Sequence, residues 1–471
     1  MGQAAGDRLR AIGAAAMIAL ALAEILYLVG GAAWAGAIGR GLALAVVVTL
    51  LPRFGLREWV LLALASGLTA GVAIDRGGVG VLAGALDTGA FFAAFILLIT
   101  ALREAAVTSP AVLALGHYLT RQQPGRRLFA SYVGGHLSGV LMNFGAISLL
   151  APLVQRGVRA EPVETPEDER RVLIREQRQL SALIRGFGNV ITWAPTTLTQ
   201  AVVLSALPGL DQSRVIALGL GFSALLLPVA WAEDRLRWGK PRSRAPGLDV
   251  PRFPWAAARD MGLVAAILIG GAYSVQGALG ITTAQALMTM APLMLLGWVF
   301  TQNLDDGAGA AVRAVRRRMG EVVAGPLPRM TRDAFLLGVA GFIGTAAGIL
   351  APVEAIAEAL AIDRMPVWLF LSVLPVIVII SGNFALSPLM MVVFLAAVIT
   401  ALPEMPADPN LIAFSLTAGW ALSMTASPNA TGPILLAGIT GLPTTTLTWR
   451  WNGVYSLAAL ALLILLFFLF A

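Results

Sequence analysis

Hydrophobic residues occur along the chain in runs of about 20, separated by short polar or charged links. A run of this length crosses the hydrocarbon core of a membrane as one helix. Two weaker amphipathic stretches, 107–120 and 301–330, are expected to lie along the membrane surface. The uninterrupted runs predict spanning helices at 11–30, 35–52, 58–74, 86–103, 213–231, 260–278, 283–300, 333–352 and 452–471.

Two further apolar runs, 182–207 and 411–440, are interrupted by polar residues around Pro195 and Pro428. An unpaired backbone N–H or C=O in hydrocarbon costs several kcal/mol, so unwound segments persist only where protein or a water-filled cavity surrounds them. We therefore predict two broken helices. In the second, Ser427 can cap a new helix and Pro428 can take its first position. An ordinary proline kink is the alternative.

The apolar runs 128–154 and 367–402 predict re-entrant hairpins. Arginines flank the first run on both sides, so a simple crossing would leave one basic flank outside, against the positive-inside tendency. A hairpin with its tip near Asn143 keeps both flanks in the cytoplasm. The second run lies between two acidic links, 353–365 and 403–410, and is expected to enter from the opposite side.

The order of a hairpin followed by a broken helix occurs twice, and the pairs Asn143-Phe144 and Asn383-Phe384 mark the two tips. Hairpins that enter from opposite sides define an inverted-topology repeat, with a site near the membrane midplane. The fold class predicted is an all-α polytopic membrane protein with about eleven spanning helices. The predicted parts are a first repeat (1–234, with hairpin 128–154 and broken helix 182–207), a cytoplasmic linker (235–259) and a second repeat (260–471, with hairpin 367–402 and broken helix 411–440).

Composition and charge agree with this layout. Of 471 residues, 58% are hydrophobic and 13% charged, and the net charge of +7 comes from loop residues, which indicates membrane orientation rather than nucleic-acid binding. The layout places the N-terminus in the cytoplasm and the C-terminus in the periplasm, and it leaves only Arg76, Arg214 and Arg364 outside. The length of the first run and its Glu24 favour a retained helix over a cleaved signal peptide. The Arg-, Ala- and Gly-rich composition suggests a bacterial inner-membrane protein.

Several chemistries are excluded or disfavoured. The chain has no cysteine, which excludes disulfides, thiolate catalysis and cysteine-ligated metals. The hairpins and broken helices are expected to offer His136 as their ionisable group, and we expect it to satisfy a local hydrogen bond, with Trp193 packing nearby. Glu24 and Asp87 are expected in structural ion pairs or at the interface, and the Arg/Glu-rich stretch 170–185 as a solvated cytoplasmic helix.

The tips and breaks resemble the ion transporter superfamily, particularly the divalent anion:sodium symporter family of dicarboxylate and sulfate carriers. Asn143 and Asn383 stand at the tip asparagines, and Ser427-Pro428-Asn429-Ala430 is similar to the second break motif. The chain departs from the family where Met142 and Gly145 replace the flanking Ser and Thr, and where Thr196 follows Pro195. The resemblance implies eleven spanning helices, an elevator-type mechanism in which hairpins and broken helices move together, and a homodimer.

Candidate site residues follow from the oxygen chemistry of sodium and from helix N-termini, although the same residue types also cap helices. Candidate cation ligands are Asn143, Gly145, Ser148, Pro195, Asn383, Ser387, Ser427 and Pro428. Candidate substrate ligands are Asn143, Thr196, Thr197, Thr199, Asn383, Asn429 and Thr431.

The predicted function is sodium-coupled uptake of a small divalent anion, without a cofactor and without enzymatic activity. Positive helix ends at Pro195, Pro388 and Pro428 favour an anion. Three alternatives stay open: an exporter of an oxyanion or sulfur compound or a cation/proton antiporter on the same fold, a membrane-embedded enzyme, and a channel. The shortage of acids and histidines disfavours the enzyme, and the lack of a pore-lining charge ring disfavours the channel.

Overall fold

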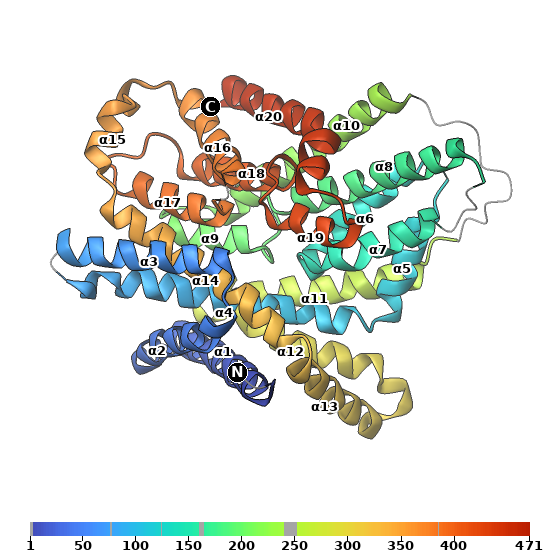
Figure 1. Cartoon of the computed structure of the whole chain (residues 1–471), viewed down its shortest axis with the longest axis horizontal. Helices are drawn as coiled ribbons and strands as arrows, with labels where there is room; N and C mark the ends of the chain where they lie inside the picture. The colour runs from blue at the N-terminus through green and yellow to red at the C-terminus, as the bar shows by residue number, and fades with distance from the viewer. Residues whose placement is uncertain (1–2, 76–77, 124, 160–163, 240–251, 385) are drawn as a thin grey trace. The chain divides into compact units, whose positions relative to one another are not determined.

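A computed structural model describes residues 3–75, 78–123, 125–159, 164–239, 252–384 and 386–471. Within these ranges every regular element is a helix (Figure 1). Contacts between residues divide the chain into two compact units. Unit 1 comprises Met1–Ala105, Ala266–Ile356 and Val392–Leu402, and unit 2 comprises Ala106–Ala265, Ala357–Met391 and Pro403–Ala471.

Unit 1 is a bundle of long apolar helices. Helices α1 and α2 form an antiparallel pair, and α3 packs against α14. Helices α4 and α14 approach closely at two glycines, since a Cβ on Gly89 would lie 2.9 Å from the carbonyl oxygen of Gly338. The helices of this unit are α1 (Gln3–Leu28), α2 (Ala33–Leu50), α3 (Leu56–Asp75), α4 (Ala83–Ala106), α12 (Thr283–Gln302), α13 (Ala308–Ala324) and α14 (Leu327–Leu350), with the later parts of α11 (Trp255–Leu279) and α17 (Pro388–Thr400).

Ion pairs connect the helices of unit 1. Arg40 on α2 donates to both carboxylate oxygens of Asp87 on α4 at 3.0 Å, so the expected structural ion pair of Asp87 is confirmed. Glu24 is buried on α1, where a Cβ on Gly39 would lie 2.7 Å from its carboxylate. Arg40 and Asp87 pair between helices, which agrees with the high cost of an unpaired charge in an apolar bundle, whereas the expected ion pair of Glu24 stays a prediction.

Unit 2 contains the first predicted hairpin and both predicted broken helices. The first hairpin is α6 and α7, the broken helices are α8 with α9 and α18 with α19, and α16 is the first arm of the second hairpin. The helices of this unit are α5 (Pro110–Thr120), α6 (Arg127–Met142), α7 (Gly145–Arg159), α8 (Pro166–Val190), α9 (Leu198–Ala206), α10 (Gln212–Trp238), α16 (Val367–Asn383), α18 (Pro409–Ala426), α19 (Thr431–Thr440) and α20 (Trp451–Phe470); the short α15 (Val353–Ala359) lies at the boundary.

The first arm of each hairpin runs parallel to the broken helix of its own repeat. Residues of α6 contact α8 residues about 50 positions later in the sequence, as expected for parallel helices. At Gly186 the two backbones approach so closely that a Cβ on this residue would collide with the carbonyl group of Tyr132. Helices α16 and α18 are paired in the same way. The two broken helices run in opposite senses, because Gly188 faces Met424 while the earlier Ile184 faces the later Gly432. This is the arrangement that an inverted repeat requires.

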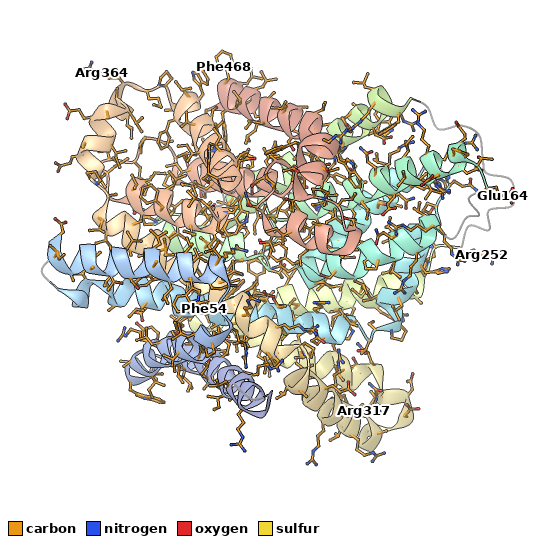
Figure 2. All side chains as sticks on the ribbon, in the orientation of Figure 1. Phe54, Glu164, Arg252, Arg317, Arg364 and Phe468 are labelled. Carbon is orange, nitrogen blue, oxygen red and sulfur yellow. The ribbon has the colours of Figure 1, made fainter. Side chains whose placement is uncertain are left out.

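The predicted class, an all-α polytopic membrane protein, is confirmed. Within the described ranges, nine helices are long and apolar enough to cross a membrane, and they match the nine uninterrupted runs. Both predicted broken helices are also present, and that they bring the number of crossings to eleven stays a prediction. Large apolar side chains lie exposed on the outer faces of these helices; Phe468 on α20, for example, projects outward and is 60% exposed (Figure 2). Such faces are suited to contact with lipid.

Several predicted boundaries and environments are wrong. The first broken helix begins at Pro166 rather than 182, so stretch 170–185 belongs to a helix whose Glu176 and Arg185 are buried, not solvated. Helix α10 continues to Trp238, which shortens the predicted linker 235–259, and residues 240–251 of that linker lie outside the described residues. Helix α8 begins early at a capping box of Thr165 and Asp168, and farther along Arg178 and Arg185 pair with Asp234 and Glu233 of α10 inside unit 2.

The second predicted hairpin, 367–402, does not lie within one unit. Helix α16 and the first residues of α17 belong to unit 2, whereas Val392–Leu402 belongs to unit 1. The two predicted surface arms also separate, since α5 belongs to unit 2 and α13 to unit 1. Both hairpins were expected to move as one unit with the broken helices. For most of α17, the second arm of the second hairpin, this expectation is wrong.

Candidate functional site

The first break is a single turn centred on a proline. The amide of Thr197 donates to the carbonyl of Ala194 at 3.0 Å, which closes a four-residue turn with Pro195 in its second position. Proline suits this position because its φ is already fixed near the required value. Helix α9 then begins at Leu198, with Thr197 as its N-cap residue. Pro195 therefore lies within the turn and does not begin the helix.

The second break has the same form. The amide of Ala430 donates to the carbonyl of Ser427 at 3.2 Å, and Pro428 again takes the second position of the turn. Helix α19 begins at Thr431, with Ala430 as its N-cap residue. The prediction that Ser427 caps a helix beginning at Pro428 is wrong by one turn, because the proline is used in a β-turn instead. Ser427 is the C-cap residue of α18.

The third residue of each turn bonds to the neighbouring hairpin. In the first break, Thr196 Oγ1 donates to the carbonyl of Val140 on α6 at 2.5 Å. In the second, Asn429 Nδ2 donates to the carbonyl of Gly382 on α16 at 3.0 Å and to that of Asn383 at 3.4 Å. The structure therefore brings each break beside the hairpin tip of its own repeat, as the sequence predicted.

The first tip is a sharp turn at Asn143. This residue has a φ of +49° and a ψ of −133°, backbone space that favours glycine and that asparagine rarely adopts. Its amide donates to Gly139 O at 2.9 Å, and its carbonyl accepts from Ala146 N at 3.0 Å. Its side-chain Nδ2 is buried and has no hydrogen-bond partner among the described residues. Gly145 follows as the first residue of α7.

The remaining predicted residues of the first half are close to this turn but are bonded locally. Ser148 Oγ lies 3.5 Å from the carbonyl of Phe144, and Thr197 Oγ1 donates to Ala194 O at 2.8 Å. Thr199 is buried in the first turn of α9. Gln200, which the sequence did not single out as a ligand, donates across the break to Thr192 O at 2.7 Å, while its Oε1 has no partner in the described part of the chain.

The second tip is more open. Asn383 Nδ2 donates to Ile379 O at 2.8 Å, and its Oδ1 accepts from Trp449 Nε1 at 3.1 Å. Ser387 is half-buried directly before Pro388, which begins α17 as predicted. The predicted tip also includes Ala385, which lies outside the described residues. Both polar ends of Asn383 are therefore already bonded within the protein.

Ser427 contrasts with its neighbours because it is fully buried and its Oγ has no partner among the described residues. It faces the backbone of α16, where a Cβ on Gly382 would lie 2.5 Å from the hydroxyl. Pro428 is buried and Asn429 half-buried, whereas Thr431 is exposed. Thr431 is thus the predicted substrate residue that the fold encloses least.

The two halves of the candidate site touch through small and apolar residues. A Cβ on Gly432, near the start of α19, would lie 3.6 Å from the side chains of both Ile147 on α7 and Ile184 on α8. Ile147 is one helical turn beyond Asn143, and Gly432 follows closely after Asn429. The first hairpin tip, the first break and the second break therefore converge inside unit 2, where α6, α7, α8 and α19 lie together (Figure 1).

The fold of the chain has a counterpart among solved structures. The chain is similar to the crystal structure of the YdaH transporter of Alcanivorax borkumensis, with a TM-score of 0.51 and 17% identity, over 87% of this chain and 95% of that one. It has the fold of a membrane transporter. No family model and no curated protein matches the sequence. At this identity the likeness concerns the fold, and the roles of the individual site residues stay predictions.

His136 lies beside the first break and is bonded at both ring nitrogens. Its Nδ1 lies 3.0 Å from the carbonyl of Gly186, and Trp193 Nε1 donates to its Nε2 at 3.0 Å. The two bonds require the neutral tautomer with its proton on Nδ1. Protonation of Nε2 would remove the acceptor of the Trp193 N–H. The expected local hydrogen bond of His136 and packing of Trp193, whose ring centroid lies 5.6 Å away, are both confirmed.

The sequence analysis missed a buried charge next to the first break. Arg185 is 3% exposed, donates to Glu233 Oε2 at 2.9 Å and to Asn452 Oδ1 at 2.7 Å, and lies 4.4 Å from the ring centroid of Tyr455. The expectation that His136 is the ionisable group of these segments is therefore wrong. Arginine suits such a site because its planar group can satisfy several partners at once.

Asn189, at the end of α8, continues this network. Its Nδ2 donates to the hydroxyl groups of Tyr132 and Tyr455, which links α6, α8 and α20. Asn452 in turn donates to Leu447 O at 2.7 Å in a π-helical turn, η5 (Thr446–Arg450), just before α20. The only sequence signal of this network is the occurrence of polar residues within apolar segments, which does not reveal their partners.

Proposed function

We propose that the protein is a secondary active transporter that takes up a small divalent anion, of dicarboxylate or sulfate type, together with sodium ions. The observation that carries the proposal is the convergence of two helix breaks and a hairpin turn in unit 2. There, buried polar atoms of Asn143 and Ser427 have no hydrogen-bond partner among the residues that the structure describes. Broken helices of this kind form substrate and ion sites in secondary transporters. The transporter fold supports the same conclusion.

Uncapped helix starts support an anionic substrate. Neither Thr197 nor Ala430, the N-cap residues of α9 and α19, provides a side-chain acceptor for the first N–H groups of its helix. Such N–H groups and the positive end of the helix dipole bind anions. In the proposal the substrate is held by these groups together with Asn143, Thr196 and Asn429, and more peripherally by Thr199, Asn383 and Thr431.

Sodium is the proposed coupling ion because oxygen donors are abundant at the turns. The first site would use Asn143, Gly145, Ser148 and Pro195, and the second Asn383, Ser387, Ser427 and Pro428, with backbone carbonyls supplying part of each shell. Proton coupling through His136 is less well supported, since both of its nitrogens are already engaged. The buried Arg185–Glu233 pair is the observation that favours the second candidate, a proton-coupled exporter or antiporter.

The proposed mechanism is of the elevator type, with unit 2 carrying the substrate. Support comes from the division of the chain, which gathers the first hairpin and both broken helices in one compact unit. We further propose a homodimer in the bacterial inner membrane, with a cytoplasmic N-terminus and a periplasmic C-terminus. No enzymatic activity is proposed, because the candidate residues are suited to binding oxygen-rich ions rather than to acid–base or nucleophilic chemistry.

The test is the thermal stability of the purified protein against dicarboxylates, tricarboxylates, sulfate, sulfonates and arsenite, each in sodium or potassium salt at fixed ionic strength. A ligand present at a hundred times its Kd stabilises the folded state by about 2.7 kcal/mol. We expect one class of anion to raise the unfolding temperature in sodium but not in potassium. A rise in unfolding temperature that is the same in sodium and potassium but depends on pH would instead support the proton-coupled candidate.

A further inference from the structure

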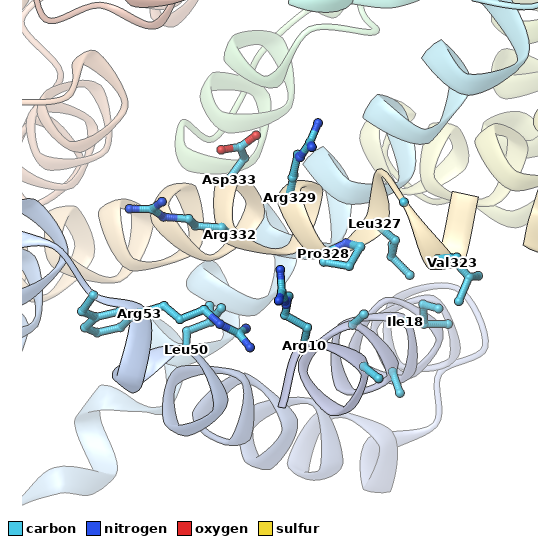
Figure 3. A pocket seen from close by; sticks show the side chains of 16 residues that line it. Arg10, Ile18, Leu50, Arg53, Val323, Leu327, Pro328, Arg329, Arg332 and Asp333 are labelled. Atoms are coloured by element: carbon cyan, nitrogen blue, oxygen red, sulfur yellow. The ribbon is translucent and has the colours of Figure 1, made fainter. Parts of the chain in front are cut away.

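Unit 1 contains a large cavity, of about 1010 Å³, that plays no part in the proposed transport site (Figure 3). It lies between the α1–α2 pair, the end of α13 and the start of α14. Four of its 16 lining residues are arginines, Arg10, Arg53, Arg329 and Arg332, and Asp333 is the one carboxylate among them. The lining therefore has an excess of positive charge.

The arginines are not spread evenly around the cavity. Arg10 and Arg53 lie between α14 and the α1–α2 pair, Arg332 extends at the level of α14 itself, and Arg329 and Asp333 project from the other side of α14 (Figure 3). Arg332 is paired with the buried Glu58, and Arg53 donates to the carbonyl of Gly6. These contacts fix the direction of two guanidinium groups.

The rest of the wall is apolar. Ala14, Ile18, Leu50, Phe54, Val323 and Leu327 line it. A cavity with guanidinium groups at one side and aliphatic or aromatic side chains elsewhere is suited to an amphiphile with an acidic headgroup rather than to a small inorganic ion alone. Arginine is the residue best matched to phosphate oxygens, which it can bind with two parallel hydrogen bonds.

The position along the helices agrees with a headgroup. Arg10 lies in the first part of α1, Arg53 directly after α2 in the 3-10 turn η1 (Leu51–Arg53), and Arg332 in the second turn of α14. Because α1 and α2 are antiparallel, the start of α1 and the end of α2 lie at the same end of the pair. The cluster is thus located at helix ends, the depth at which lipid phosphates occur.

We propose that this cavity binds one anionic glycerophospholipid, with its phosphate on Arg10, Arg53 and Arg332 and an acyl chain along Ile18, Leu50 and the neighbouring apolar wall. The proposal is independent of the transport site, since every lining residue belongs to unit 1. The lipid would connect the α1–α2 pair to α14 and thereby stabilise unit 1.

The test is native mass spectrometry of the full-length protein in detergent with phosphatidylglycerol or with phosphatidylcholine of the same acyl chains. We expect one phosphatidylglycerol to be retained, and phosphatidylcholine to bind at least about tenfold more weakly, because basic side chains attract a headgroup with net negative charge. The double variant Arg10→Gln/Arg53→Gln should lose this preference. The Arg10→Lys/Arg53→Lys variant, which keeps the charge, should restore most of it.

Arg317→Gln is the matched control, because it removes the same charge from α13 at a side chain that is 77% exposed and projects away from the helix (Figure 2). It should bind phosphatidylglycerol as the wild type does. Equal binding of both lipids, or an unchanged preference in the glutamine double variant, would overturn the proposal. So would displacement of the lipid by millimolar inorganic phosphate, which would identify the ligand as a free anion. If the double variant does not fold, Arg10→Gln alone gives the same comparison.

Discussion

The two helix breaks of unit 2 have the same backbone turn but differ in how their side chains are used. In the first, Thr192, Thr196 and Thr197 all donate to backbone carbonyls, and Gln200 spans the break to Thr192 O. In the second, Asn429 bonds to the hairpin tip, while the buried Ser427 hydroxyl has no partner among the described residues. The first break is therefore held by its own side chains more completely than the second.

The two broken helices also differ in charge. Helix α8 carries Arg178 and Arg185, which pair with Asp234 and Glu233 on α10, whereas α18 has no charged residue in its sequence. Helix α18 is instead held by close apolar packing, as where a Cβ on Gly419 would lie 2.7 Å from Pro375 of α16. We infer that the first broken helix is mainly a fixed support, and that the second is the part whose polar groups are left available for a ligand.

The largest expected effect comes from breaking the charged support. Arg185→Gln should lower the free energy of unfolding by about 3–5 kcal/mol, because it leaves the carboxylate of Glu233 buried without its main partner. The measurement is the thermal unfolding of the detergent-purified protein. Arg171→Gln, at a side chain that is 60% exposed, is the control and should change little. Equal losses in both variants would contradict the supporting role of the buried pair.

A crossed pair of substitutions tests the difference between the breaks directly. Thr192→Val removes a hydroxyl whose single proton lies within reach of both Asn189 O and Gly219 O. It should cost about 1–3 kcal/mol of stability while leaving the sodium-dependent rise in unfolding temperature intact. Ser427→Ala removes a hydroxyl that has no partner in the described residues and should change stability by less than about 0.5 kcal/mol.

The same Ser427→Ala variant should nevertheless lose the sodium-dependent rise in unfolding temperature that the anion produces. Thermal unfolding of both variants, in sodium and in potassium with the stabilising anion, gives the two readouts together. If Ser427→Ala lowers stability and keeps the shift, the hydroxyl is structural and the comparison between the breaks is wrong.

The smallest expected effect lies at the exposed start of α8. The hydroxyl of Thr165 holds the pKa of Asp168 below its ordinary value of 3.8 in a capping box that closes the first turn. A carboxyl whose pKa is lowered in the folded state stabilises it above the ordinary pKa and loses that contribution as pH falls through the lowered value. Thr165→Ala should therefore raise the pKa of Asp168 and speed hydrogen exchange in the first turn at neutral pH. No difference between variant and wild type would exclude the capping role.

The spanning helices, the two tips and the two breaks could be predicted from the sequence because each depends on local information. Run length defines the spans, and a proline among polar residues marks a break. The start of α19 at Thr431 could not be predicted, because Pro428 fits both the second position of a β-turn and the first position of a helix. The bond from Asn429 to Gly382 O, 47 residues away in sequence, favours the turn.

The charged support was missed for a similar reason. Arg185 and Glu233 are 48 residues apart; Arg185 ends the Arg/Glu-rich stretch 170–185, and Glu233 is followed by Asp234 and Arg235, so both lie in sequence typical of a solvated segment. Only the packing of α8 against α10 and α20 shows that both are buried. The sequence likewise gave no sign that α17 passes from one compact unit to the other.

The most direct test of the proposed site is sodium-driven uptake of the stabilising anion into proteoliposomes. Wild type, Asn143→Ala and Asn429→Ala are compared, with Asn303→Ala in unit 1 as a control that removes the same side chain outside the site. The account predicts uptake at background in both site variants, normal uptake in the control, and folded protein in all four samples. Uptake at the wild-type rate by Asn143→Ala and Asn429→Ala would show that the converging turns of unit 2 do not form the transport site.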